Sequence, residues 1–250
     1  MFTIDPREDR ASRRARMVSR ALKMLELPLL LAVPACMAAA AWSGVEQAGL
    51  LMLLVVGLVL ALFFAGFEAG RPALRQIMPT LVLASLAAAG RILFGAIPDF
   101  KPVLAIAIIA GAALGPRSGF MVGSLAAFTS NFFFGQGMWT PWQMYAWGAV
   151  GYLGGALART GLFDAGDGGV RIAALVPFGF ASGLFYGLII NAFDVIAYVR
   201  PLTWQGALAR FAMALPFDLM HGVATVVFLV ALYGPWTRRI ARVVRKYGVR

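Results

Sequence analysis

The sequence predicts an all-α integral membrane protein with eight transmembrane helices and both termini in the cytoplasm. Its composition is the first observation that supports this fold class. The 250 residues are 61% hydrophobic and only 13% charged, and the mean hydropathy is +0.80. Soluble domains are about 45–50% apolar and about 25% charged, so this chain has too few polar side chains to cover a water-soluble globule. The second observation is a series of eight apolar runs. The third is the position of basic residues at the ends of these runs.

Each apolar run, taken with its flanking residues, is long enough to cross a bilayer, which requires about 20 residues. The first two runs are rich in Leu, Val and Ala and hold almost no polar groups, so we expect them to form an added hairpin. The other six form the core of the protein. In chain order the runs cover residues 27–42, 48–67, 77–96, 102–115, 119–134, 142–158, 172–191 and 207–233.

The direction of the helices follows from Lys and Arg, which membrane proteins concentrate in short cytoplasmic loops. With the N-terminus inside, 18 of the 22 Lys and Arg residues lie on the cytoplasmic side, and the outer loops keep only Lys101 and Arg200. The same placement argues against a nucleic-acid-binding protein, although the formal net charge is +11. The predicted parts are a basic cytoplasmic tail (1–26), a transmembrane hairpin (27–70), a six-helix core (76–236) and a second basic cytoplasmic tail (237–250).

Cysteine and histidine each occur once, as Cys36 and His221. The chain therefore has no internal disulfide, and a metal site built from His and Cys is not expected. A cleaved signal peptide that ends near Cys36 is an alternative for the first run, and it leaves the direction of the other seven unchanged. The sequence holds no GxSxG, HExxH or Walker A motif, so we expect neither an enzyme nor a cofactor.

Small residues recur at a spacing of four in several runs. This spacing places them on one face of a helix, where two backbones can approach closely. We expect most of these faces to pack inside the bundle. The face of the third run is an alternative site for a partner protein. The sets are Ala84 with Ala88, Ser85 with Ala89, Gly119 with Gly123, Gly151 with Gly155, and Gly179 with Gly183 and Gly187.

Polar side chains inside the apolar runs gather in the predicted outer half of the bundle. A charge at the centre of a membrane helix costs about 2.5–3.5 kcal/mol on insertion scales, so each needs a reason. The gathering on one side predicts a pocket that opens outward rather than a channel. The alternatives are that Arg210 pairs with Asp194 or Asp218 only to join helices, and that His221 bonds a backbone carbonyl. In the last run, Arg210, Asp218 and His221 are spaced by eight and three, which places all three on one stripe of the helix. The residues are Arg91, Asn131, Asn191, Arg210, Asp218 and His221, with Asp194 just after the run 172–191.

Two predicted outer loops complete this pocket. The first is the turn 97–102, in which two prolines hold extended geometry around a short connection. The second is the segment 131–143, where aromatic faces and amides suit a ring-bearing organic solute, or else form an interfacial aromatic belt. Together, the expected solute-binding residues are Arg91, Asp99, Lys101, Asn131, Gln136, Trp139, Trp142, Gln143, Asp194 and Arg210.

From about residue 80 to 235 the sequence resembles the substrate-binding S components of energy-coupling factor (ECF) transporters, a branch of ABC-type micronutrient importers. The segment 131–143 is the most specific part of this resemblance. The resemblance covers the six-helix core, whereas the N-terminal hairpin departs from the usual six helices. The segments that carry it are 84–91, 97–102, 110–116 with Gly119, and 131–143.

The resemblance implies a six-helix bundle in the cell membrane that binds a vitamin or related compound at its outer face. Cobalamin or a cobalamin precursor is the leading substrate, because the 131–143 pattern is most similar to that group. The implied partners are a membrane-embedded T component and two cytoplasmic ATPases. An Ala-x-x-x-Ala face implies contact with the T component through Ala84, Ser85, Ala88 and Ala89. A secondary transporter or channel that acts alone is the alternative, although no repeat between the two halves supports it.

Overall fold

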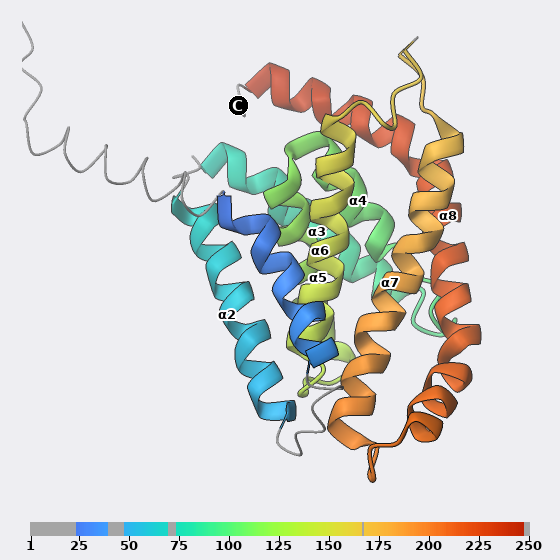
Figure 1. Ribbon diagram of the computed structural model, residues 1–250. Helices are drawn as coiled ribbons and strands as arrows, with labels where there is room; N and C mark the ends of the chain where they lie inside the picture. Colours follow the sequence, from blue (N-terminus) through green and yellow to red (C-terminus); the bar gives the residue numbers. More distant parts are fainter. Residues whose placement is uncertain (1–23, 40–47, 70–73, 167, 248–250) are drawn as a thin grey trace, which may run out of the picture.

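The computed structural model describes residues 24–39, 48–69, 74–166 and 168–247. Over these residues the chain forms eight α-helices, and the only β structure is an isolated bridge between Asp164 and Val170. This confirms the all-helical fold class, and Figure 1 shows the helices gathered in one bundle. The helices are Met24–Ala39, α2 (Ala48–Ala69), α3 (Leu74–Leu93), α4 (Val103–Leu114), α5 (Pro116–Phe134), α6 (Thr140–Arg159), α7 (Ile172–Tyr198) and α8 (Trp204–Tyr247).

Most helices begin and end within a few residues of the predicted runs, but α8 is much longer. It has 44 residues, so the predicted basic tail at 237–250 is the continuation of α8 up to Tyr247. Arg, Lys and Ala are good helix formers, so the charges that end an apolar run do not end the helix. Pro216 and Pro235 lie inside α8. Figure 1 shows its last stretch turning across one end of the bundle, as proline kinks allow.

Glycine contacts bring α4, α5 and α6 together at the centre of the bundle. A Cβ atom added at Gly151 would lie 2.2 Å from the carbonyl oxygen of Gly119, and one added at Gly111 would lie 2.1 Å from that of Gly151. The backbones therefore touch, as the small-residue spacing predicted for α5 and α6. Every residue of α4 from Val103 to Gly111 is buried, so this short helix fills the middle of the core.

The N-terminal hairpin packs into the same core and is not a separate unit. The Phe63 ring of α2 stacks on Phe120 of α5 with centroids 4.0 Å apart. Val33 of the first helix is fully buried in the main hydrophobic cluster. The Tyr145 hydroxyl of α6 donates a hydrogen bond to the carbonyl oxygen of Leu30. The predicted hairpin (27–70) therefore precedes the core in the sequence, but its described residues pack against the core helices.

A buried ion pair joins the first helix to the core. Arg117 at the start of α5 pairs with Glu26, whose second carboxylate oxygen accepts a hydrogen bond from the Tyr152 hydroxyl at 2.8 Å. Arg117 also donates to the carbonyl oxygen of Gly66 in α2 at 3.0 Å. Glu26 and Arg117 both lie just outside the predicted apolar runs, so this polar cluster is at the predicted inner boundary of the bundle. Arg117, in the first turn of α5, is thus paired with an acidic residue 91 positions away in the sequence.

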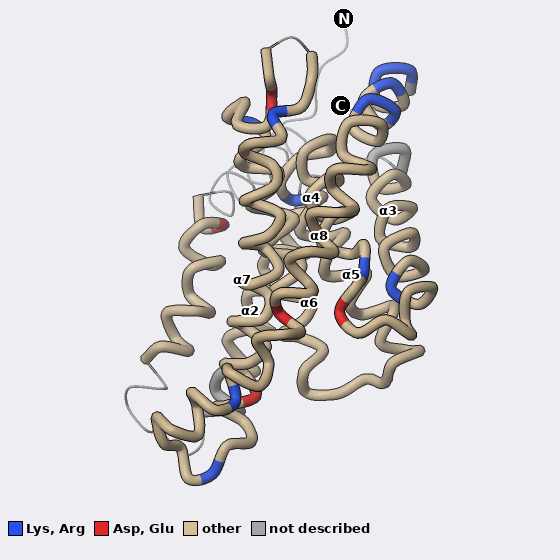
Figure 2. The backbone as a smooth tube through the Cα atoms, turned by 90° about the vertical axis from the view of Figure 1, so that its right-hand side faces the viewer, with Lys and Arg blue, Asp and Glu red and all other residues tan. Residues whose placement is uncertain are grey.

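The outside of the bundle is largely apolar. Helices Ile172–Tyr198 and Trp204–Lys246 are long and apolar enough, by length and composition, to cross a membrane. Large apolar side chains stand exposed on α3, α5 and α8, and Figure 2 shows few charged residues along the helices and a concentration of basic ones near the C-terminus. We call the end with connections 94–102, 135–139 and 199–203 the turn end, and the end with 160–171 the tail end.

Candidate functional site

Lys101 holds together the connection between α3 and α4. Its ammonium donates to the carbonyl oxygens of Phe94 at 2.6 Å, of Gly95 at 3.4 Å and of Ile97. An ammonium has three donors, and all three are used inside this turn. Burial lowers the pKa of Lys101, while the neighbouring Asp99 carboxylate opposes that shift. Lys101 therefore fixes the turn, and it has no donor left for the predicted contact with a solute.

Asp99, in the same turn, faces the bundle interior through a contact with His221. Its backbone φ of 49° is in the left-handed region, which Asp tolerates better than most residues. Its Oδ1 lies 3.6 Å from Nδ1 of His221. His221 is only 2% exposed, and neither ring nitrogen has a hydrogen-bond partner among the described residues. The expected bond from His221 to a backbone carbonyl is thus not formed.

Arg91 of α3 anchors a buried polar network. Its guanidinium donates to Ser130 Oγ at 2.7 Å and to Asn131 Oδ1 at 2.5 Å on α5. The amide nitrogen of Asn131 donates in turn to Thr140 Oγ1 at 3.0 Å and to Gln143 Oε1 at 2.8 Å on α6. The structure brings the predicted residues Arg91, Asn131 and Gln143 together. Their polar groups bond to one another, which is the arrangement expected of a link between helices.

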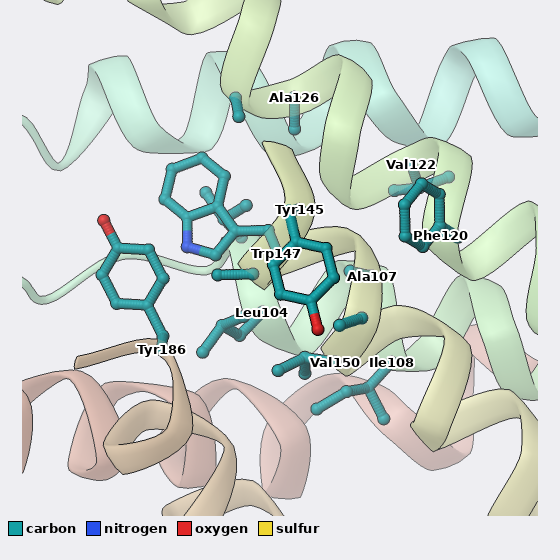
Figure 3. Close-up of a cluster of buried hydrophobic side chains, with 14 of the residues drawn as sticks. Leu104, Ala107, Ile108, Phe120, Val122, Ala126, Tyr145, Trp147, Val150 and Tyr186 are labelled. Atoms are coloured by element: carbon teal, nitrogen blue, oxygen red, sulfur yellow. The ribbon is translucent and has the colours of Figure 1, made fainter. Parts of the chain in front are cut away.

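The network continues through aromatic rings to α7 and α8. The Gln143 amide donates to the Tyr186 hydroxyl oxygen at 3.1 Å. The Tyr186 ring stacks on Trp147 with centroids 5.5 Å apart, and it lies 4.5 Å from the imidazole of His221. Figure 3 shows Tyr186 and Trp147 beside each other in the buried cluster. The Arg91 guanidinium lies 5.0 Å from the Trp147 ring centroid, so one chain of contacts links α3 to α8.

A cavity of about 310 Å³ lies between α7, α8 and the turn that carries Asp99. This volume is at the lower end of the range of about 300–1,000 Å³ that small-molecule sites occupy. Its wall is amphipathic, with two carboxylates, one amide, one guanidinium and two aromatic rings. The lining residues are Asp99, Tyr186, Gly187, Ile190, Asn191, Arg210, Met213, Ala214, Phe217 and Asp218.

The charges around the cavity are unevenly paired. Arg210 forms an ion pair with Asp194, which is one of the two pairings expected for it. Asp218 instead accepts a hydrogen bond from the Asn191 amide at 2.8 Å. Among the described residues, no Lys or Arg nitrogen lies within 4.0 Å of the Asp99 or Asp218 carboxylates. The cavity therefore carries two carboxylates without a cationic partner.

Gly187 makes room for one of these carboxylates. A Cβ atom at this position would lie 2.2 Å from both Cγ and Oδ1 of Asp218. The neighbouring Gly183 allows the backbones to meet, since its Cβ would lie 2.3 Å from the amide nitrogen of Gly222. The glycine spacing of α7, predicted as a packing face, thus also shapes the cavity.

The cavity extends from the predicted outer turn, through Asp99, along α7 as far as Tyr186. Tyr186 is five residues before the end of the predicted run at 191, or about 7 Å at about 1.5 Å per residue. Of the ten predicted binding residues, Asp99 and Arg210 line the cavity, and Asp194 touches it only through Arg210. The stripe formed by Arg210 and Asp218, eight residues apart on α8, does face the cavity as its spacing indicated.

The aromatic segment before α6 does not contribute to the cavity wall. Trp142 is 1% exposed and stacks on Phe193 with centroids 5.2 Å apart, so its faces are already covered. Trp139 is 39% exposed at the turn end. Gln136 donates to the carbonyl oxygen of Phe128 and accepts from Thr140. These residues build the turn end of α5 and α6, and none of them lines the cavity.

Eight of the ten residues that line the cavity were not among the predicted binding residues, and three of these eight, Tyr186, Asn191 and Asp218, carry polar groups. Asn191 and Asp218 were recognised only as polar groups in apolar runs, and the spacing of Asp218 from Arg210 was the signal that connected it to the site. Tyr186 was missed entirely. A tyrosine inside an apolar run has the same sequence signature as a packing residue, so the sequence carried no signal for it.

The predicted partner face of α3 is divided by burial. Ala84 and Ala88 are 5% and 3% exposed, so they pack within the bundle. Ser85 and Ala89 are exposed. The half of the small-residue face that remains open to another protein is therefore the one formed by Ser85 and Ala89.

A second cavity, of about 240 Å³, lies at the tail end beside Asp164, Tyr233 and Arg238. It shares no lining residue with the first cavity. The buried helix α4 lies in the core between the two ends of the bundle. In the part of the chain that the structure describes, no group of three or more His, Cys, Asp or Glu residues is arranged to hold a metal ion.

Comparison with known proteins gives one family. The model of a family of unknown function, DUF6580, matches residues 71–244. Neither a curated protein nor a solved structure matches the chain. The match covers α3 to α8 and begins after α2.

Proposed function

The chain belongs to the DUF6580 family, and we propose that it is the substrate-binding membrane subunit of an ECF-type importer. In this role it takes up a vitamin or related micronutrient at the outer side of the cell membrane. It hydrolyses no ATP itself. A membrane T component and two cytoplasmic ATPases supply the energy and complete the importer.

The apolar exterior supports a multi-pass membrane protein. The exposed apolar side chains include Leu86 on α3, Phe132 on α5 and Leu208 on α8, with exposed fractions of 45%, 68% and 65%. Large exposed apolar surfaces mark contacts with lipid or with other proteins. Lipid on all sides accounts for apolar residues exposed on several helices at once. With both termini in the cytoplasm, as the distribution of Lys and Arg predicts, the turn end faces outward and the tail end faces the cytoplasm.

The observation that carries the proposal is the cavity between α7 and α8. It combines a volume suited to a small solute with a lining of both charged and aromatic side chains. Such a combination is typical of binding sites, in which a few polar groups fix the orientation of a ligand within apolar walls. A channel would need a polar path through the bundle, whereas α4 fills the middle of the core with buried residues.

The direct test is assembly with the predicted partners. The chain is co-expressed with the T component and the two ATPases of its own genome and purified by a tag on the ATPases. We expect the wild-type chain to co-elute in a stable complex. Ser85→Leu and Ala89→Leu should abolish co-elution, because a bulky side chain separates backbones that must approach closely.

Val227→Leu is the control, since Val227 is exposed on α8, away from the tested face of α3, and the change only enlarges an already branched side chain. This variant should co-elute like the wild type. A wild-type chain that never co-elutes with these partners, while remaining folded and monodisperse, would contradict the proposed function. In that case the alternative function, a transporter that acts alone, would be favoured.

A further inference from the structure

We propose that the solute held between α7 and α8 is a small organic cation, a protonated amine whose ammonium lies between Asp99 and Asp218. This inference rests on the proposed function and specifies the substrate class of the same cavity. It differs from the cobalamin-type substrate that the sequence suggested. A corrinoid has a macrocycle with a nucleotide side arm, and it does not fit a cavity of about 310 Å³.

The charge of the cavity carries the argument. Asp99 and Asp218 both line it, and no Lys or Arg nitrogen lies within 4.0 Å of either carboxylate in the described part of the chain. An unpaired carboxylate within a membrane helix is costly, which applies to Asp218 in α8, whereas the Asp99 side chain is 37% exposed in its turn. A cationic solute supplies the missing partner, whereas an anionic solute adds a third negative charge.

The basic groups nearby are already engaged. Arg210 lines the cavity but forms an ion pair with Asp194. Lys101 donates its hydrogen bonds to three carbonyl oxygens of its own turn. Arg91 is bonded to Ser130 and Asn131. Each of these cations has its hydrogen bonds committed elsewhere, and none of them forms an ion pair with Asp99 or Asp218.

His221 provides a second and independent observation. It is 2% exposed, both of its ring nitrogens lack a hydrogen-bond partner among the described residues, and Nδ1 faces Asp99 Oδ1 at 3.6 Å. Most buried polar groups in native proteins are hydrogen-bonded, so an unpartnered imidazole in contact with a cavity-lining carboxylate is unusual. His221 does not itself line the cavity, and the acceptors for the three donors of a primary ammonium are the Asp99 and Asp218 carboxylates.

The remaining walls suit the organic body of such a cation. Phe217 presents an aromatic ring, which can attract a cation through its face and pack against apolar groups. Tyr186 also lines the cavity, although its ring is already stacked on Trp147 and in contact with His221. Met213 and Ile190 add apolar surface. The volume corresponds to about ten water molecules at about 30 Å³ each, which limits the solute to a compact molecule.

The test compares three probes of nearly equal shape: benzylammonium, benzyl alcohol and benzoate. The full chain is placed in lipid nanodiscs, and binding is measured by ligand-observed NMR titration, with empty nanodiscs as the blank. A ligand of about eight non-hydrogen atoms binds in the millimolar range, so each titration extends to about 10 mM. We expect benzylammonium to bind at least about tenfold more tightly than either other probe, because charge-assisted hydrogen bonds are the strong ones.

Asp218→Asn tests the site with little risk to folding, because an asparagine can still accept the hydrogen bond from Asn191. It should weaken benzylammonium binding about tenfold or more. Asp164→Asn is the matched control, since it makes the same change at the tail-end cavity, and it should leave binding unchanged. Equal or tighter binding of benzoate or benzyl alcohol would overturn the proposal. So would unaltered benzylammonium binding in Asp218→Asn, or no saturable binding in the folded wild-type chain.

These outcomes are separable from the test of the proposed function. Co-elution with the T component and ATPases without a preference for benzylammonium would leave the importer role standing and reject the cation. A preference for benzylammonium that Asp218→Asn abolishes, without co-elution, would keep the cationic site and reject the importer role.

Discussion

At the scale of single residues, Asn131 shows how a polar residue in an apolar run can serve the bundle. It is fully buried and bonds Arg91, Thr140 and Gln143 at once. Asn131→Ala removes three hydrogen bonds and leaves Gln143 Oε1 without its donor, while Arg91 and Thr140 keep other partners; an unsatisfied buried group costs about 1–3 kcal/mol. We therefore expect a clear fall in the unfolding temperature of the detergent-solubilised protein, followed by tryptophan fluorescence.

Gln136→Ala is the control for this experiment, because its hydrogen bond to Phe128 is solvent-exposed. It should lower the unfolding temperature much less than Asn131→Ala. An Asn131→Ala variant that unfolds like the wild type would show that this amide does not hold the helices together. Its place in the predicted binding set would then regain support.

The candidate site could be predicted from the sequence only in part, for a physical reason. Spacing along one helix is visible in a sequence, so the shared face of Arg210 and Asp218 was found. Which polar groups satisfy one another across helices is not visible. Arg91 and Asn131 therefore looked like solute ligands, although their hydrogen bonds are made within the protein. The role of Tyr186 depends on its neighbours from α6 and α8, which no local pattern encodes.

At the scale of elements, the contact between α5 and α6 depends on glycine. A Cβ atom at Gly151 would lie 2.2 Å from the carbonyl oxygen of Gly119, a backbone atom that cannot move without shifting its helix. Gly151→Ala should therefore destabilise the protein by about 1–3 kcal/mol, the usual cost of overpacking. The measurement is the midpoint of unfolding in a denaturant series.

Gly57→Ala is the matched control, because a Cβ atom there meets nothing within 4 Å. It should be neutral or stabilising by about 0.5–1 kcal/mol, since alanine is the better helix former. If both variants unfolded at the same midpoint, the close approach of α5 and α6 would be refuted.

Helices themselves were predicted well because apolar runs record them directly. The predicted ends differ from the observed ones where polar or basic residues mark the end of an apolar run but the helix continues beyond them. α7 continues to Tyr198 past the polar residues Asn191 and Asp194, and α8 continues through its basic end to Tyr247. The tight packing of the hairpin was not predicted, because Glu26 and its partner Arg117 are 91 residues apart.

At the scale of the whole molecule, the distribution of Lys and Arg predicts the topology. A reporter fused after residue 250 should be active only as a cytoplasmic fusion, and one inserted within 199–203 should report the outside. The charge bias is strong, with only Lys101 and Arg200 in the outer loops. Reporters that place the C-terminus outside would contradict both the number of crossings and the assignment of the turn end as the outer end.

The central claim is that the chain binds one solute in the cavity between α7 and α8. Native mass spectrometry of the protein, purified in mild detergent from cells grown in rich medium, tests it most directly. We predict one bound organic molecule per chain in the wild type. Gly187→Ala should lose that molecule, because its Cβ displaces the Asp218 carboxylate, whereas Gly57→Ala should retain it. A wild-type chain that carries no solute, or a Gly187→Ala variant that carries the same solute equally well, would contradict the account.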